Sequence, residues 1–182
     1  MIEKAHLFLH LAAEIEAFFS SPANAWRRRE LRSLGVVFCE PISTRRHFRI
    51  HRPGGIQIGR RAAFGDHTQL MNFTRIDIGD DFLSAGNLII TTGTHDPLTL
   101  TPGAAPVKIG ARVWCGVNVT ILAGVVIGDD VVIGAGSLVN KDIPGNSVAA
   151  GVPARVLRPL DRSGVSPLWN WTPPNEQPPT NL

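Results

Sequence analysis

The chain has 182 residues, 43% of them hydrophobic and 18% charged, which is enough for one main domain with its own core and short extensions. Its formal net charge is +3, and the basic residues gather between Arg27 and Arg61, so charge alone does not indicate a nucleic-acid-binding protein. No apolar run approaches the roughly 20 residues needed to span a bilayer, and the N-terminus does not resemble a secretion signal. Two cysteines, Cys39 and Cys115, are too few for a disulfide framework, which predicts reduced thiols and a cytoplasmic protein.

Residues 1–54 are predicted to form a helical segment that caps the rest of the chain. Apolar residues at helical spacing indicate a first helix over residues 5–19. Pro22 interrupts this pattern, and a second helix is expected over residues 25–34, ended by Gly35.

The second predicted helix contains four arginines, Arg27, Arg28, Arg29 and Arg32. One interpretation is an amphipathic helix that contacts a membrane surface or a partner protein. The other is a cap over the open end of a repeat structure, with the arginines in solvent. The capping interpretation is favoured because the end of a solenoid must be covered.

From Val107 onward the sequence repeats every six residues. Two rows stand two positions apart, one of Ile109, Cys115, Ile121, Ile127, Ile133 and Val139, the other of Val107, Val113, Val119, Val125, Val131, Ser137 and Ile143. A period of six fits neither an amphipathic helix nor an ordinary half-buried strand, and a short fixed period is typical of a solenoid. Three short strands per coil, each with inward aliphatic side chains, would make a parallel β-helix of triangular section.

The same rows are present in weaker form earlier in the chain. Ile58, Phe64 and Leu70 stand six apart, and after a slip of phase the row continues with Ile78, Ser84 and Ile90. We therefore expect an all-β solenoid domain over residues 55–158, with about five coils before residue 150.

The rows vanish between residues 91 and 106. This stretch, TTGTHDPLTLTPGAAP, contains three prolines and two glycines, so it is expected to be a loop that leaves the coil. Loops held by a rigid framework often carry function, and this one contains His95, a residue type suited to general-base catalysis near neutral pH. After the domain, residues 159–182 are rich in proline and are expected to form an extended tail.

A family resemblance is carried by two segments, IDIGDDFLSAGNLIITTGTHDP and PVKIGARVWCGVNVTILAGVVIGDDVVIGAGSLVNKDIPGNSVAAGVPARVLR. They resemble the hexapeptide-repeat acyltransferases, and most closely the maltose and galactoside acetyltransferases and the polysaccharide O-acetyltransferases. The resemblance implies a left-handed parallel β-helix, acetyl-CoA as cosubstrate with no metal required, and a homotrimer whose cofactor groove lies between neighbouring coils.

The resemblance also implies roles for single residues. His95 falls on the catalytic base, which takes a proton from the acceptor hydroxyl as that oxygen attacks the acetyl-CoA thioester. The implied cofactor-binding residues are Trp114, Gly116, Val117, Ala135, Asn140, Lys141, Arg155 and Arg158. Within this set, Trp114 is expected to point outward and pack by the pantetheine arm, and the Gly116 N–H is the expected donor to the oxyanion. Asn140 replaces a threonine that is common in the family, so no side-chain hydroxyl contact is expected there.

Two residues are implied on the acceptor side of the site. Asn72 resembles the family asparagine that hydrogen-bonds the acceptor sugar, with a hydrogen-bond ladder inside the coil as the alternative. Asp96 would orient the His95 imidazole, with closure of a turn before Pro97 as an equally good alternative. The chain lacks an extra loop of the maltose and galactoside enzymes, so the acceptor is expected to differ from theirs.

These residues predict an acetyl-CoA-dependent O-acetyltransferase that acts on a hydroxyl of a saccharide, such as a cell-surface polysaccharide or lipopolysaccharide precursor. An N-acetyltransferase of an amino sugar nucleotide would use the same base and groove, and a non-catalytic solenoid scaffold is the alternative from a different class. A zinc enzyme of the γ-carbonic anhydrase kind is disfavoured, because it needs three converging histidines and the expected solenoid contains His67 and His95.

Overall fold

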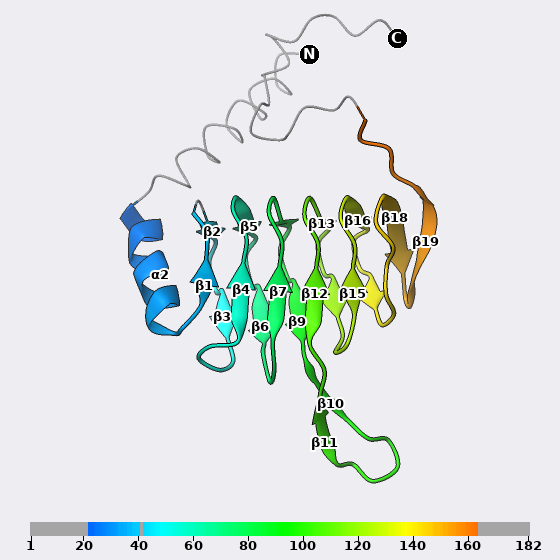
Figure 1. Cartoon of the computed structure of the whole chain (residues 1–182), viewed down its shortest axis with the longest axis horizontal. Coiled ribbons are helices and arrows are strands. Elements are labelled where there is room, and N and C mark those ends of the chain that lie inside the picture. The colour runs from blue at the N-terminus through cyan, green and yellow to red at the C-terminus, as the bar shows by residue number, and fades with distance from the viewer. Residues whose placement is uncertain (1–21, 41, 164–182) are drawn as a thin grey trace, which may run out of the picture.

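The computed structural model describes residues 22–40 and 42–163, and these fold into a parallel β-solenoid of about six turns with one helix at its N-terminal end (Figure 1). The parallel solenoid predicted from the six-residue rows is confirmed. The helix predicted over residues 5–19 lies outside the described residues, as does the predicted tail beyond residue 163.

The helix, α2 (Pro22–Ser33), begins earlier than predicted. Pro22 stands at its start, where no backbone N–H is needed for a hydrogen bond within the helix. The helix ends in a Schellman motif, in which the Val36 N–H donates to the Leu31 carbonyl (3.0 Å) and Gly35 adopts a positive φ of 72°. Leu31 is buried in the core of the first coil, so α2 covers the N-terminal end of the solenoid (Figure 1).

Three sheets form the faces of the prism, and each of the first five coils contributes one strand to each sheet. The first sheet contains β1 (Val37–Phe38), β4 (Ile56–Ile58), β7 (Ile76–Ile78), β12 (Val107–Ile109) and β15 (Val126–Ile127). The second contains β2 (Ile42–Thr44), β5 (Ala62–Phe64), β8 (Leu83–Ser84), β13 (Trp114–Cys115), β16 (Val131–Ile133), β18 (Ser147–Gly151) and β19 (Ala154–Pro159). The third contains β3 (Arg49–Ile50), β6 (Gln69–Met71), β9 (Ile89–Thr91), β14 (Thr120–Ile121) and β17 (Leu138–Val139).

The solenoid starts earlier than the predicted boundary between residues 54 and 55. Strands β1, β2 and β3 already form a complete coil, which pairs in parallel with β4, β5 and β6. Its inward positions are Val36, Ile42 and Phe48 and, two residues later, Phe38, Thr44 and Ile50, so the six-residue rows extend into this coil. The next inward residue, Ile56, follows Phe48 only after eight residues, which interrupts the rows. His47 and His51 therefore also belong to the solenoid, in addition to the two histidines expected in it.

Both predicted rows from Val107 onward are buried, and they form the continuous core of the prism. The slip of phase has a structural cause. Arg60 and Asp80 on neighbouring early coils are 20 residues apart, whereas Arg112 and Asp130 on later coils are 18 apart. The extra residues lie where the chain turns from the third sheet back to the first, a position that we call the third corner.

The third corner also carries the stretch over which the rows vanish. Residues 92–106 leave the prism there as an antiparallel hairpin of β10 (Gly93–His95) and β11 (Pro102–Ala104), which projects beyond the coils (Figure 1). The prediction that this stretch leaves the coil is confirmed, and it has more regular structure than a plain loop. The longer corners of the two preceding coils, residues 51–55 and 72–75, are stacked on the N-terminal side of the hairpin.

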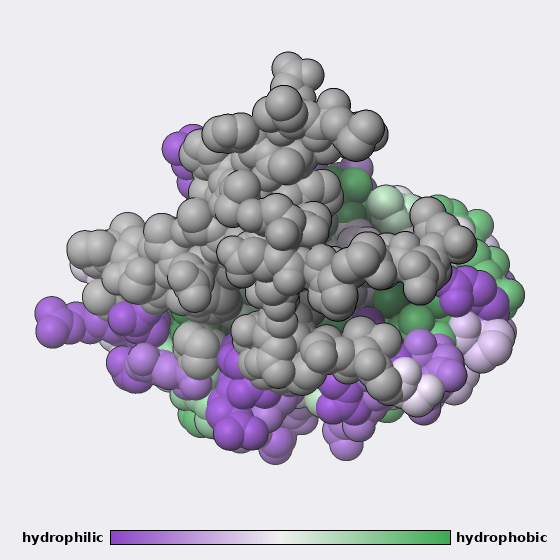
Figure 2. Space-filling view, turned by 90° about the horizontal axis from the view of Figure 1, so that it is seen from above, coloured by the Kyte–Doolittle hydropathy of each residue, from purple (hydrophilic) through white to green (hydrophobic). Residues whose placement is uncertain are grey.

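The surface differs along the prism. Figure 2 shows hydrophilic side chains along one long edge and hydrophobic ones toward the end that carries β18 and β19. At that end Val152, Val156 and Leu157 are exposed. The described part of the chain includes no helix long and apolar enough to cross a membrane.

Candidate active site

His95 lies at the end of β10, where it pairs across the hairpin with Pro102. Its side chain is exposed and makes no hydrogen bond with any other described residue. The hairpin thus holds the backbone of this histidine in a defined register while its imidazole stays accessible. An accessible imidazole on a backbone fixed by strand pairing is what proton transfer to or from a bound substrate requires.

Asp96, the next residue, is engaged in the turn at the tip of the hairpin. Its Oδ1 accepts hydrogen bonds from the N–H groups of Leu98 (2.9 Å) and Thr99 (2.8 Å), and from the Thr99 hydroxyl (3.1 Å). These bonds, with the Thr99 N–H as the largest contributor, hold the pKa of Asp96 below its usual value. The contacts match the turn-closing alternative, and no hydrogen bond joins Asp96 to His95 among the described residues.

The base of the hairpin packs on an aromatic side chain from the preceding coil. A Cβ added at Gly93 would lie 2.6 Å from the Phe73 ring, so glycine is needed for this close approach. Phe73 in turn has the His51 ring 4.7 Å away and the Arg52 guanidinium 5.0 Å from its centroid. The hairpin therefore stands against a cluster built by the two longer third corners.

The implied cofactor residues begin on the second sheet. Trp114 on β13 points outward and is 45% exposed, as predicted, while the adjacent Cys115 is fully buried. Burial raises the pKa of the Cys115 thiol to about 12, so this thiol is neutral and takes no part in chemistry at the surface. Trp114 therefore presents its indole to solvent on a face otherwise made of short strands.

The expected oxyanion donor, the Gly116 N–H, is already used by the fold. It donates to the Ile133 carbonyl of the next coil at 2.8 Å, so it is not available to a ligand, and this part of the prediction is wrong. The next amide, that of Val117, makes no hydrogen bond with any other described residue. Val117 lies at the corner between the second and third sheets and is 43% exposed, so its N–H is the free donor at this position.

The other implied cofactor residues follow toward the C-terminal end. Ala135 lies one coil beyond Gly116 at the same corner, and a Cβ added at Gly116 would clash with the Ala135 backbone. Asn140 and Lys141 are exposed at the third corner of the last coil. Arg155 and Arg158 are exposed on β19, each with a guanidinium bonded to a nearby carbonyl oxygen. All of these except Gly116 are accessible to a ligand.

Asn72, the implied acceptor residue, is instead a structural part of the coil. It is 3% exposed, its Nδ2 donates to the carbonyls of Arg52 (2.8 Å) and Gly54 (2.7 Å), and its Oδ1 accepts from the Arg52 N–H (3.0 Å). The carboxamide closes the longer third corner beneath it. No capacity is left for a sugar hydroxyl at the amide nitrogen, so the ladder alternative holds.

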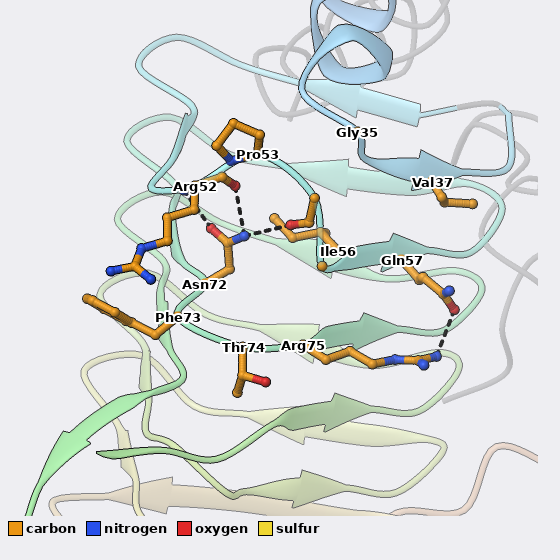
Figure 3. Close-up of a pocket in the computed structure, with 12 residues that line it drawn as sticks. Gly35, Val37, Arg52, Pro53, Ile56, Gln57, Asn72, Phe73, Thr74 and Arg75 are labelled. Atoms are coloured by element: carbon orange, nitrogen blue, oxygen red, sulfur yellow. Dashed lines mark hydrogen bonds between the residues drawn. The ribbon is translucent and has the colours of Figure 1, made fainter. Parts of the chain in front are cut away.

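A groove that the sequence reading missed runs beside these corners. It has a volume of about 410 Å³ and is lined by residues that include Val37, Arg52, Gln57, Phe73, Thr74 and Arg75 (Figure 3). The signal that could have located it was the slip of phase, because the extra residues at the third corner build its floor and rim.

A single chain does not bring all implied residues together. His95 stands on the third corner, whereas Trp114 lies on the second sheet and Val117 on the corner after it, with the third sheet between them. The described residues contain no group of three or more His, Cys, Asp or Glu side chains that could hold a metal ion, and the His47 and His67 rings are stacked on each other at 4.5 Å.

Comparisons with known proteins agree with this architecture. Residues 106–141 match the family model "Bacterial transferase hexapeptide (six repeats)". The putative colanic acid biosynthesis acetyltransferase WcaF of Escherichia coli K12 is 32% identical over 157 residues, which cover 85% of this chain and 86% of that protein. The crystal structure of a maltose O-acetyltransferase from Clostridium difficile 630 is 35% identical with a TM-score of 0.70, over 84% of this chain and 85% of that one.

A hexapeptide-repeat acetyltransferase of Vibrio cholerae O1 biovar eltor, solved in complex with acetyl-coenzyme A, is 26% identical with a TM-score of 0.70, over 82% of this chain and 85% of that one. The solenoid, the projecting hairpin and the extent of these matches lead to one assignment. The chain belongs to the hexapeptide-repeat acetyltransferase family and is an enzyme of the acyltransferase class.

Proposed function

We propose that the protein transfers an acetyl group from acetyl-CoA to a hydroxyl of a saccharide, with His95 as general base. The observation that carries this proposal is the accessible His95 on a hairpin of fixed register, in a chain of this family. Relatives named for colanic acid biosynthesis and for maltose acetylation support a saccharide acceptor. A related structure with bound acetyl-coenzyme A supports the donor.

In the proposed reaction, the His95 imidazole removes the proton from an acceptor hydroxyl while the oxygen attacks the thioester carbonyl carbon. The Val117 N–H donates to the carbonyl oxygen as it becomes negatively charged. When the carbon–sulfur bond breaks, the imidazolium returns its proton to the leaving thiolate, so the products are the acetyl ester and free coenzyme A. Val117 replaces Gly116 in this role because its amide is the one that the coil leaves unpaired.

We further propose that each site lies between two copies of the chain in a homotrimer. His95 of one copy and Trp114 with Val117 of another would meet there, since one chain holds them on different parts of the prism. The hairpin tip supports this arrangement, because Leu98 is 92% exposed and Leu100 is 72% exposed. Two large apolar side chains at the end of a projecting hairpin favour contact with another protein surface.

Mixing two inactive variants tests both parts of the proposal. His95→Ala should lack the base, and Trp114→Ala should lack the cofactor contact and be nearly inactive at low acetyl-CoA. After equal amounts of the two are unfolded and refolded together, each mixed trimer would have one site that combines an intact His95 with an intact Trp114 from different copies, which is about a quarter of all sites. Thiol release from acetyl-CoA should then recover to about that fraction of the wild-type rate.

Each variant refolded alone is the control and should stay inactive. Recovery in the mixture would require a site shared between copies, whereas no recovery, with mixed trimers present by mass measurement, would contradict the shared site. A parallel screen with an amino sugar nucleotide in place of neutral and charged sugars separates the two chemistries. Thiol release with the amino sugar nucleotide alone would replace the O-acetyltransferase proposal with the N-acetyltransferase alternative.

A further inference from the structure

The groove beside the third corners is positively charged. Of the side chains that line it, Arg52 and Arg75 carry charge, and the lining contains no carboxylate. The rest of the lining is apolar or neutral, with Val37 and Phe73 both exposed and Gln57 on β4. Whether such a groove attracts a negatively charged ligand depends on how far each of the two cations is already paired.

The two arginines differ in how much of their charge is already balanced. The Arg75 Nε donates to both carboxylate oxygens of Asp77, at 2.6 and 2.7 Å, and its NH2 group donates to the Gln57 side chain. The Arg52 guanidinium lies over the Phe73 ring and forms no ion pair with any described residue (Figure 3). Arg52 is therefore the cation that is held in place and still free to bind an anion.

The groove and His95 lie on the same side of the hairpin. Side chains in a strand alternate between faces, so Gly93 and His95 face the same way and Thr94 the other. The missing Cβ of Gly93 points at the Phe73 ring, and a Cβ on Gly103 would meet the Thr94 methyl on the opposite face. His95 is thus about 7 Å further along the face of β10 that rests on Phe73.

From this placement we infer that the acceptor carries an anionic group, a carboxylate or a phosphate, which Arg52 binds while a hydroxyl of the same molecule reaches His95. This rests on the proposed function for the reaction at His95, but the anion site has its own geometry. The planar guanidinium offers paired N–H donors that match both groups. A neutral sugar would leave this cation without a partner, so the groove selects charged acceptors.

The test compares three acceptors of similar size: methyl glucuronide, glucose 1-phosphate and methyl glucoside. With the wild-type protein, thiol release should show a lower KM for at least one of the charged acceptors than for methyl glucoside. Arg52→Gln should raise that KM about tenfold, with kcat and the KM for acetyl-CoA unchanged, and with no effect on methyl glucoside. Arg52→Lys should recover part of the loss. A preference for the glucuronide identifies a carboxylate, and one for the phosphate identifies a phosphate ester.

The matched control is Arg29→Gln, which removes an exposed arginine of α2 and should change no KM. If the neutral and charged acceptors react equally well and Arg52→Gln alters neither, the anion site is refuted, while the acetyl transfer itself still supports the proposed function. If no acceptor releases thiol, the proposed function fails, and the anion site is then judged by binding alone. In that case, an NMR titration should show saturable shifts with glucuronide or phosphate that Arg52→Gln abolishes, and no such shifts would refute it.

Discussion

The coils of the prism and the hairpin that leaves them are built on different principles. In the coils, inward side chains such as Ile121 and Ile133 are fully buried, and backbone N–H groups bond to the next coil in parallel register. In the hairpin, every residue from Thr94 to Ala104 is exposed, and three antiparallel residue pairs hold it together. The coils gain stability from burial that the hairpin does not have.

The coils therefore provide most of the stability of the fold, and the hairpin carries the proposed catalytic residue. An inward side chain in the coils is fixed by its neighbours and cannot be truncated without cost to stability, whereas the hairpin can vary as long as its base is held. The hairpin is joined to the coils at the contact between Gly93 and the Phe73 ring. Loss of the His95 side chain in the hairpin should therefore lower the rate without changing stability, and truncation of a core side chain should do the reverse.

The largest effect is expected from His95→Ala. Loss of a general base typically lowers turnover by about 10² to 10⁴-fold, and acetyl-CoA binding should stay nearly intact because the imidazole is not among the cofactor contacts. The midpoint of urea unfolding should not move, since the side chain is exposed and bonded to no other described residue. Thr94→Ala, on the other face of β10, is the control and should keep its turnover. Full turnover in the His95 variant would remove this residue from the mechanism.

The opposite result is expected from Ile121→Ala. Ile121 is 0% exposed on β14, between β9 and β17, and truncation of a buried isoleucine typically costs about 2–5 kcal/mol of unfolding free energy. Urea unfolding measures this loss, with the neighbouring outward residue in Thr120→Ala as the control. Under conditions where the variant is folded, kcat should be retained. A loss below about 1 kcal/mol would mean that the coil can collapse around the gap.

The solenoid could be predicted because its period is a direct consequence of which side chains face inward. The rows from Val107 onward are buried as expected, and the interruption after Thr91 leaves the coil as expected. The first coil was missed although its inward residues Val36, Ile42 and Phe48 stand six apart, because the next inward residue, Ile56, follows only after eight. A repeat reading loses a row where a corner of the solenoid contains extra residues.

The details of the site could not be predicted from the sequence, because they depend on how one coil pairs with the next. Which amide remains free is set by the register of one coil on the next, and the register gives the Gly116 N–H to Ile133 and leaves that of Val117 unpaired. Asn72 was placed in the right part of the molecule, but its three hydrogen bonds close a corner. The slip of phase marked that corner in the sequence, although nothing in the spacing showed that Arg52 would lie over Phe73 beside it.

The smallest effect is expected from Asp96, and it separates the two roles considered for this residue. Its pKa is lowered by the hydrogen bonds that the carboxylate accepts at the hairpin tip, so those bonds are present above the ordinary aspartate pKa of about 3.9 and are lost as the pH falls through the lower value in the folded protein. NMR signals of the Leu98 and Thr99 amides should stay constant down to about pH 4 and shift below it, and Asp96→Asn should abolish the shift. Near neutral pH the carboxylate is fully ionised, so a turn-closing role predicts little change in kcat for Asp96→Asn. An orienting role of the kind seen in catalytic triads would instead predict a loss of about 10⁴-fold, and a loss of that size would show that the tip rearranges to bring Asp96 to His95 when substrates bind.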